Sequence, residues 1–129
     1  MAGTLTISTL SDGTNSTSST NCIRGSAKAY VQFTGTAGVG TINASYNVSS
    51  ITYNGTAGDF TVNMTTAMPS ANYCVTAAAS ATGSSQIAAM PFTSAYAPVA
   101  PSSSAFRIFT GSYTSGLSPA YINVAVFSL

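Results

Sequence analysis

Very few side chains in this sequence could take part in acid–base chemistry. The 129 residues include no histidine, two carboxylates and three basic side chains. The carboxylates, Asp12 and Asp59, are far apart in the chain and each stands next to a glycine. Asp-Gly and Gly-Asp pairs are typical of turns in which the carboxylate accepts hydrogen bonds from its own backbone. Because a general acid–base pair needs two titratable groups held together, the sequence predicts no catalytic residues and no enzymatic function.

The sequence also lacks the residue combinations that nucleophilic catalysis and metal binding require. A serine or cysteine nucleophile needs a neighbouring base, and Lys28 is the sole amine that could serve. The two cysteines, Cys22 and Cys74, form no CxxC pair, so no metal site is expected. The residues leave open whether these thiols form a disulfide; we expect them in apolar or half-buried places. The glycine-rich stretch 33–41 has no phosphate-binding lysine, so it is interpreted as a hairpin loop and no cofactor is expected.

The charge content points to association rather than to nucleic acid. Charged residues make up 4% of the chain, against about 25% in ordinary domains. Affinity for phosphate backbones comes from Lys and Arg, and three scattered cations argue against a nucleic-acid partner. A surface covered by Ser, Thr, Asn and Gly offers little net repulsion between molecules. We therefore expect the protein to sit in an assembly, where association is the purpose.

Membrane insertion and secretion are not expected. No stretch of the sequence approaches the ~18 apolar residues that a membrane-spanning helix needs. The N-terminus, MAGTLTISTL, lacks the basic start and the apolar block of a signal peptide. We expect a complete chain that is synthesised in a cytoplasm.

Alternation of apolar and polar residues recurs along the chain and predicts strands rather than helices. In residues 41–50, Ile42, Ala44, Tyr46 and Val48 fall on one face, which predicts one half-buried strand. Asn54-Gly55 then predicts a tight hairpin turn. The remaining predicted strands are residues 4–10, 28–34, 59–67, 72–80, 83–92, 105–113 and 120–129.

This pattern predicts an all-β fold, a single antiparallel β-sandwich (jelly-roll-like) of about seven or eight short strands. Residues 22–129 form the predicted sandwich domain and residues 1–21 an N-terminal extension whose polar part, 11–21, is a linker or long loop. Edge strands in such a fold are normally protected by charges, which are nearly absent here. Edges covered by neighbouring subunits would solve the problem, which is a second indication of oligomerisation.

Seven tyrosines could contribute to a binding surface. Most fall at predicted strand positions, where we expect core or subunit-contact roles. Tyr96 and Tyr113 lie in or next to predicted loops and are the candidates for a ligand-facing loop.

The middle of the chain resembles a small domain of tailed-phage and prophage virion proteins. The likeness covers about residues 24–80 and rests on Lys28-Ala29-Tyr30-Val31-Gln32-Phe33, where the family usually has Trp in place of the tyrosine. It continues through residues 43–51 (NASYNVSSI), then Asn54-Gly55, Gly58-Asp59 and Val62-Asn63, and ends in residues 67–73 (AMPSANY). The resemblance implies a non-enzymatic virion structural protein, made in the host bacterial cytoplasm and located on the virion surface.

The resemblance also implies partners and two alternative locations. The family is similar to trimer-forming β modules at the ends of tail fibres, so a homotrimer bound to other virion proteins and to a host surface glycan is expected. The alternative is a capsid-decorating (cement or head-fibre) protein on the phage head. In both, residues 1–21 would attach the chain to the virion through Leu5, Ile7 and Leu10, with strand 4–10 added to a partner's sheet edge and 11–21 as a flexible tether.

Overall fold

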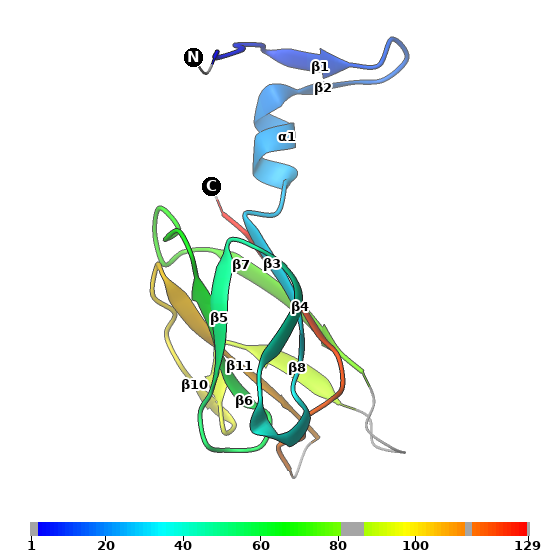
Figure 1. The fold of residues 1–129 in the computed structure, drawn as a ribbon. Coiled ribbons are helices and arrows are strands. Elements are labelled where there is room, and N and C mark those ends of the chain that lie inside the picture. Colours follow the sequence, from blue (N-terminus) through cyan, green and yellow to red (C-terminus); the bar gives the residue numbers. More distant parts are fainter. Residues whose placement is uncertain (1–2, 81–86, 113–114, 129) are drawn as a thin grey trace.

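The computed structural model describes residues 3–80, 87–112 and 115–128, which form a β-sandwich and a projecting N-terminal arm. Figure 1 shows the arm, residues 3–25, standing at one end of the sandwich. Two four-stranded sheets pack face to face, and every strand pair within them is antiparallel. The predicted antiparallel β-sandwich of short strands is confirmed.

Each sheet combines segments that are distant in the sequence. The first sheet has the order β4-β3-β12-β7 and the second has the order β5-β6-β11-β8. The strands of the first sheet are β3 (Ala29–Thr34), β4 (Thr41–Tyr46), β7 (Cys74–Ala79) and β12 (Ile122–Phe127). The strands of the second sheet are β5 (Val48–Tyr53), β6 (Asp59–Met64), β8 (Ala88–Pro91) and β11 (Ala105–Gly111). A short 3-10 helix, η1 (Thr36–Gly38), lies in the predicted hairpin loop between β3 and β4.

The core lies between the two sheets and is made by the apolar half of each alternating strand. Phe33 of β3 meets Phe60 of β6 edge to face, with ring centroids 5.3 Å apart. Ile122 and Ile108 are fully buried beside them. In β3, β6 and β12 every second residue is buried: Ala29, Val31, Phe33, Phe60, Val62, Met64, Ile122, Val124 and Val126.

Residues 41–50 do not form the single half-buried strand that their alternation predicts. The chain breaks at Asn47, whose φ is +54°, and passes from β4 in the first sheet to β5 in the second. Asn tolerates this left-handed conformation, and here its side chain secures the corner. Asn47 Nδ2 donates to the Lys28 and Thr66 carbonyls at 3.2 and 3.1 Å, and Asn47 Oδ1 accepts from the Thr66 amide at 2.8 Å. Val48 is therefore buried, while Tyr46 points outward.

The hairpin between β5 and β6 also differs from the predicted tight turn. Its loop runs from Asn54 to Gly58, because the Asn54 amide donates to the Asp59 carbonyl and the Asp59 amide donates to the Thr56 carbonyl. Gly55 and Gly58 both have positive φ, +84° and +80°. At Gly58, a Cβ atom would lie 2.0 Å from the Thr110 carbonyl oxygen of β11. The loop backbone is thus seated directly against the neighbouring strand.

The arm differs from the predicted strand and tether: within residues 4–10 only Thr9 and Leu10 lie in a strand, whereas the predicted tether contains a strand and the start of a helix. It consists of β1 (Thr9–Ser11), β2 (Ser16–Ser18) and α1 (Ser19–Gly25), with β1 and β2 paired as a small hairpin. Asp12 closes the hairpin turn, since its Oδ1 accepts from the Thr14 and Asn15 amides at 2.9 and 2.7 Å. The turn role predicted for Asp12 is confirmed. The same Ser, Thr, Asn and Asp residues that suggested a tether are also the residues that form turns and helix caps.

A second small hairpin, β9 (Thr93–Ser94) and β10 (Ala97–Pro98), lies between β8 and β11, where no strand is predicted. Its backbone is unusual, because Phe92, Ala95 and Tyr96 all have positive φ without being glycine. The hairpin is tied to β11 by the Phe92 amide, which donates to the Arg107 carbonyl at 2.8 Å. It therefore covers part of the outer face of the second sheet.

Candidate functional site

The arm exposes apolar side chains that no described part of the chain covers. Leu5, Leu10 and Ile23 have 82%, 53% and 64% of their surface exposed, and Ile7 has 40%. A shallow groove of about 370 Å³ is lined by Leu5, Thr6, Ile7, Leu10, Ser19, Cys22 and Ile23. The three predicted attachment residues thus line one groove, together with three residues of α1, Ser19, Cys22 and Ile23.

Local interactions hold the arm in shape. Ser18 caps the start of α1, where its Oγ accepts from the Asn21 amide at 3.2 Å. At the other end, the Lys28 ammonium donates to the Ile23 carbonyl and to Ser26 Oγ, the second at 2.7 Å. A cation at the last carbonyls of a helix satisfies them and favours the helix dipole. Lys28, at the entry to β3, therefore connects the arm to the sandwich.

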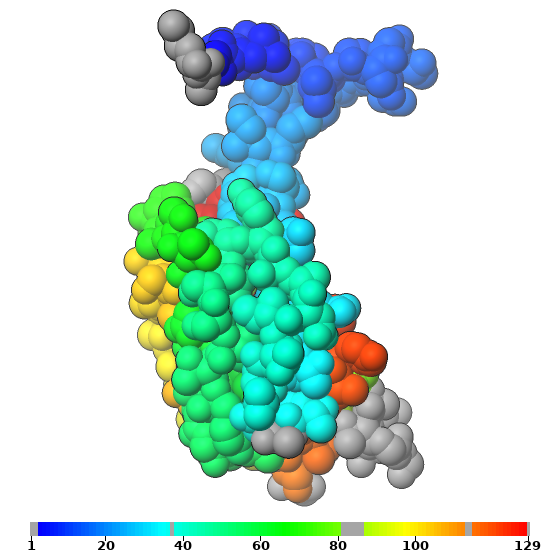
Figure 2. All heavy atoms as spheres, in the orientation of Figure 1, coloured from blue at the N-terminus to red at the C-terminus, as the bar shows by residue number. Residues whose placement is uncertain are grey.

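The arm contributes little to the core of the sandwich. No residue of α1 is buried, and the space-filling view shows the β1–β2 hairpin away from the sandwich, with α1 between the two (Figure 2). A seven-residue helix is too short to be stable on its own in water. Apolar side chains on such an element gain nothing from folding unless another surface covers them. The arm has the composition and placement of a docking element.

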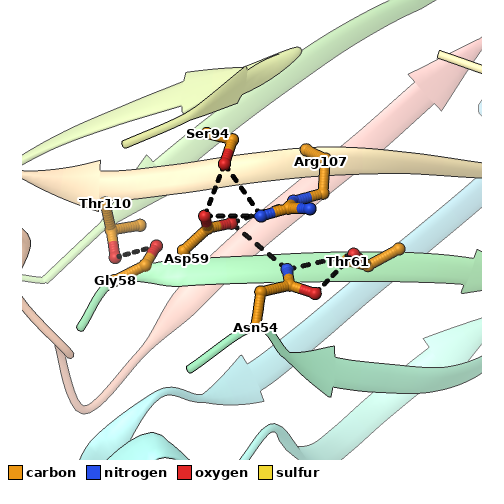
Figure 3. Close-up of polar contacts among 7 residues, drawn as sticks. All are labelled: Asn54, Gly58, Asp59, Thr61, Ser94, Arg107 and Thr110. Carbon is orange, nitrogen blue, oxygen red and sulfur yellow. Dashed lines mark hydrogen bonds and ion pairs between the residues drawn. The ribbon is translucent and has the colours of Figure 1, made fainter. Parts of the chain in front are cut away.

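A polar cluster lies on the outer face of the second sheet and is centred on Asp59 (Figure 3). Asp59 is 2% exposed and pairs with Arg107 through two hydrogen bonds, Nε to Oδ1 at 3.0 Å and Nη2 to Oδ2 at 2.5 Å. Ser94 Oγ donates to Asp59 Oδ2 at 2.7 Å, and Asn54 Nδ2 donates to Oδ1 at 3.2 Å. The cluster joins the β5–β6 loop, β11 and the β9–β10 hairpin.

The cluster is saturated by its own partners. Among the described residues, no buried side-chain nitrogen or oxygen lacks a hydrogen bond. The prediction that Asp59 serves its own turn is wrong, because its carboxylate faces Arg107 on the neighbouring strand. The signal was available in the sequence: in a chain with so few charges, Asp59 and Arg107 are an opposite pair at strand positions. The other carboxylate, Asp12, lies in the arm, so the structure brings no two carboxylates together.

The predicted ligand-facing tyrosines have different outcomes. Tyr96 lies in the turn between β9 and β10, with about half of its surface exposed. Its ring packs edge to face on Phe109 at 4.7 Å, and its hydroxyl donates to the Ser112 carbonyl at 3.2 Å. Tyr96 therefore covers Phe109 and retains one exposed side. Tyr113 lies outside the described residues.

The cysteines are separate and exposed. Cys22 lies on α1 and Cys74 begins β7, and both are free thiols. The expectation of apolar or half-buried positions is wrong, because α1 has no buried face and Cys74 falls on the outward half of β7. Within the residues that the structure describes, no cluster of three metal-ligating side chains occurs. No helix in the described part of the chain is long and apolar enough to cross a membrane.

The outer face of the first sheet carries a third surface, which sequence analysis did not single out. Tyr30, Tyr46 and Tyr121 are each about half exposed on this face, not in the core. Gln32 Nε2 donates to Asn123 Oδ1 at 2.9 Å between them. In β3 and β12 this surface is the opposite half of the alternating strand. In β4 the alternation placed Tyr46 on the predicted buried face, and the structure exposes it instead.

Comparisons with protein-family models, with curated proteins and with solved structures find no match to this chain. The resemblance to phage virion domains stays a prediction. The candidate function is therefore argued from the arm, the sandwich and the surface chemistry of this chain.

Proposed function

We propose that this chain is a non-enzymatic structural protein of a phage virion, a tail-fibre or fibre-tip component that mediates attachment or assembly. The observation that supports this most is the arm, which presents Leu5, Leu10 and Ile23 outside the sandwich. In this proposal, another virion protein covers these side chains. The sandwich is then the part of the chain that is exposed at the virion surface.

The chemistry of the sandwich supports a structural role. Its single described ion pair, Asp59 with Arg107, is saturated and joins three segments rather than facing a cleft. The four edge strands of the two sheets, β4, β7, β5 and β8, contain no charged residue. Proteins that work as free monomers usually protect such edges with charges, with proline or by keeping the strand short, and of these four strands only the short β8 contains a proline, Pro91. Subunits packed side by side, as in a homotrimer, would protect them by contact.

The test is to locate the chain on purified virions produced by the genome that encodes it. Gold-tagged antibody should label the tail or its fibres. Label spread over the head would instead assign the chain to capsid decoration, the alternative that the same architecture permits. Virions that contain none of the chain, by immunoblot and by imaging, would contradict the proposal.

A substitution series tests the arm itself. Leu5→Ser, Leu10→Ser and Ile23→Ser combined should remove the chain from virions, because the groove loses its apolar lining. Thr14→Ser with Asn21→Ser changes exposed polar residues of the same arm and serves as the matched control, with incorporation unchanged. Circular dichroism should show the same strand content in both proteins. Full incorporation of the triple variant would show that the arm is not the attachment element.

A further inference from the structure

The outer face of the first sheet is hollowed over its small residues. The hollow has a volume of about 390 Å³ and contains no charged residue in its lining: Tyr30, Val31, Gln32, Ala44, Thr76, Ala77, Ala78, Asn123, Val124 and Ala125. Pockets for small molecules usually measure about 300–1,000 Å³ and combine an apolar lining with a few placed polar groups. The hollow meets both conditions.

The strand register places the lining side chains in two adjacent rows across the sheet. One row contains Ala44, Gln32, Asn123 and Ala78, and the next contains Tyr46, Tyr30, Ala125 and Thr76. The alanines leave space above the sheet, while Tyr30 rises beside it. Tyr46 stacks against Tyr30 with ring centroids 6.0 Å apart, which supports the ring from the side away from β12.

The middle of the face carries a pair of amides. The hydrogen bond from Gln32 to Asn123 uses one donor and one acceptor of the pair. An amide side chain has two N–H donors and a carbonyl with two lone pairs, so each residue keeps further capacity that can face outward. Asn123 is exposed and Gln32 is partly exposed. The pair thus offers a donor and an acceptor side by side in a fixed orientation.

A third tyrosine extends the face beyond the amides. Tyr121 lies two positions before Asn123, on the same face, and its carbonyl accepts from the Ser80 amide at 2.8 Å. Tyr30 and Tyr121 therefore stand on opposite sides of the amide pair, about 13 Å apart along the strands at roughly 3.3 Å per residue. Of the four exposed tyrosines in the described residues, three lie on this face.

We propose that this face, defined by Tyr30, Gln32, Tyr121 and Asn123, binds a neutral oligosaccharide. The ring faces of the tyrosines accept the apolar C–H faces of sugar rings, and the amide pair exchanges hydrogen bonds with sugar hydroxyls. The lack of charge in the lining favours neutral over acidic sugars. A dry contact with a second copy fits less well, because it would bury the unused amide groups and leave the hollow empty.

This inference rests on the proposed function only for where the sugar occurs, on a bacterial surface. Binding itself can be measured with the purified chain. The probe is an array of neutral and acidic oligosaccharides from bacterial surface polysaccharides. The full chain should bind at least one neutral member, with a dissociation constant then measured by calorimetry. No binding to any neutral member, or binding to acidic members alone, would overturn the inference.

Variants assign the binding to this face. Tyr30→Ala and Gln32→Ala should each weaken binding about tenfold, which corresponds to one stacking or hydrogen-bonding contact. Ala78→Leu fills the hollow without removing a contact and should also abolish binding. Tyr96→Phe changes the exposed tyrosine on the other sheet and is the matched control, with unchanged affinity. Equal affinity in all variants would place the sugar elsewhere and overturn the assignment.

Sedimentation of the same variants distinguishes the second possible occupant. If Tyr30→Ala and Ala78→Leu lower the assembly mass and no sugar binds, the face is a contact between copies and the inference is wrong. That result would not affect the proposal that the chain is located on the virion. Conversely, a chain that binds neutral sugar but is absent from virions would contradict the proposed function alone.

Discussion

At the scale of single residues, Asp59 and Arg107 hold the outer face of the second sheet together. Asp59 is almost completely buried, whereas the Arg107 side chain is 28% exposed, so water still reaches the guanidinium. Removing one member of a buried pair leaves the other charge without compensation, at a cost of about 3–5 kcal/mol. Because Arg107 is partly hydrated, Asp59 is the member that would suffer more from losing its partner.

Arg107→Met should therefore lower the unfolding free energy by about 3 kcal/mol, at the lower end of the range for buried pairs. Urea unfolding followed by circular dichroism measures the change. Arg24→Met is the control, since Arg24 is exposed at the end of α1 and should change stability by less than about 0.5 kcal/mol. Equal stability of both variants would show that the pair contributes no more than a surface contact.

Tyr73 predicts a change of stability in alkali. Burial raises the pKa of its phenol to about 12. The hydroxyl donates a hydrogen bond to the Ser102 carbonyl oxygen at 2.8 Å. The unfolded chain loses this proton near pH 10, while the folded chain keeps it until about pH 12. Above pH 10 the folded state binds the extra proton, so stability falls as pH rises through this window.

In Tyr73→Phe this contribution is absent. The wild type should be more stable at pH 9 because of the phenol hydrogen bonds, and its advantage should shrink steadily towards pH 12. Tyr30→Phe, which removes a half-exposed hydroxyl, corrects for unrelated effects of alkali on the protein. Parallel stability curves for wild type and Tyr73→Phe across this range would contradict the prediction.

At the scale of elements, the β5–β6 loop depends on how closely its backbone approaches β11. Gly55 and Gly58 share a positive φ, but a Cβ atom at Gly55 meets nothing within 4 Å, whereas one at Gly58 meets the Thr110 carbonyl oxygen. Gly55→Ala should cost about 1 kcal/mol for the backbone conformation alone. Gly58→Ala should lower the stability clearly more, because the added Cβ atom must also push the loop away from β11. Thermal unfolding of the two variants distinguishes the cost of backbone strain from the cost of the steric clash with β11. Equal losses of stability would contradict the close contact between the loop and β11.

The elements also show how far sequence patterns reach. Alternation located the segments that form β3, β6 and β12, because burial on one side of a strand leaves a period of two. It failed at residues 41–50, because the alternation of apolar and polar residues continues through the corner at Asn47. At that one residue the chain passes from the first sheet to the second. Periodicity contains no information on which side of a corner is buried. The Asp59–Arg107 contact joins strands far apart in the sequence, and only the scarcity of charges in the chain indicated it.

Deleting the arm tests its independence from the sandwich. Removal of residues 1–25 should change the unfolding free energy of the sandwich by less than about 1 kcal/mol, because no residue of α1 is buried. Removal of residues 120–129 is the contrasting truncation. It deletes β12, which pairs with β3 on one side and β7 on the other, and should prevent folding. A sandwich that unfolds without its arm would show that α1 is part of the fold.

At the scale of the whole molecule, low charge and uncovered surfaces point to association. The arm carries an apolar groove, and the edges of both sheets lack charge. Burying such surfaces stabilises an assembly by roughly 25 cal/mol for each Å² of apolar area, with little electrostatic repulsion to oppose it. The proposed assembly would bury these surfaces, which a single copy leaves exposed to water.

The purified full chain should sediment as a homotrimer, with three times the 12.9 kDa mass of one chain. Contacts between copies through these surfaces would be apolar rather than ionic, so raising the salt concentration should leave the mass unchanged or strengthen the assembly. Native mass spectrometry checks the number of copies independently of shape. A chain that stays monomeric at tens of micromolar in both methods would mean that its edges are protected without neighbours.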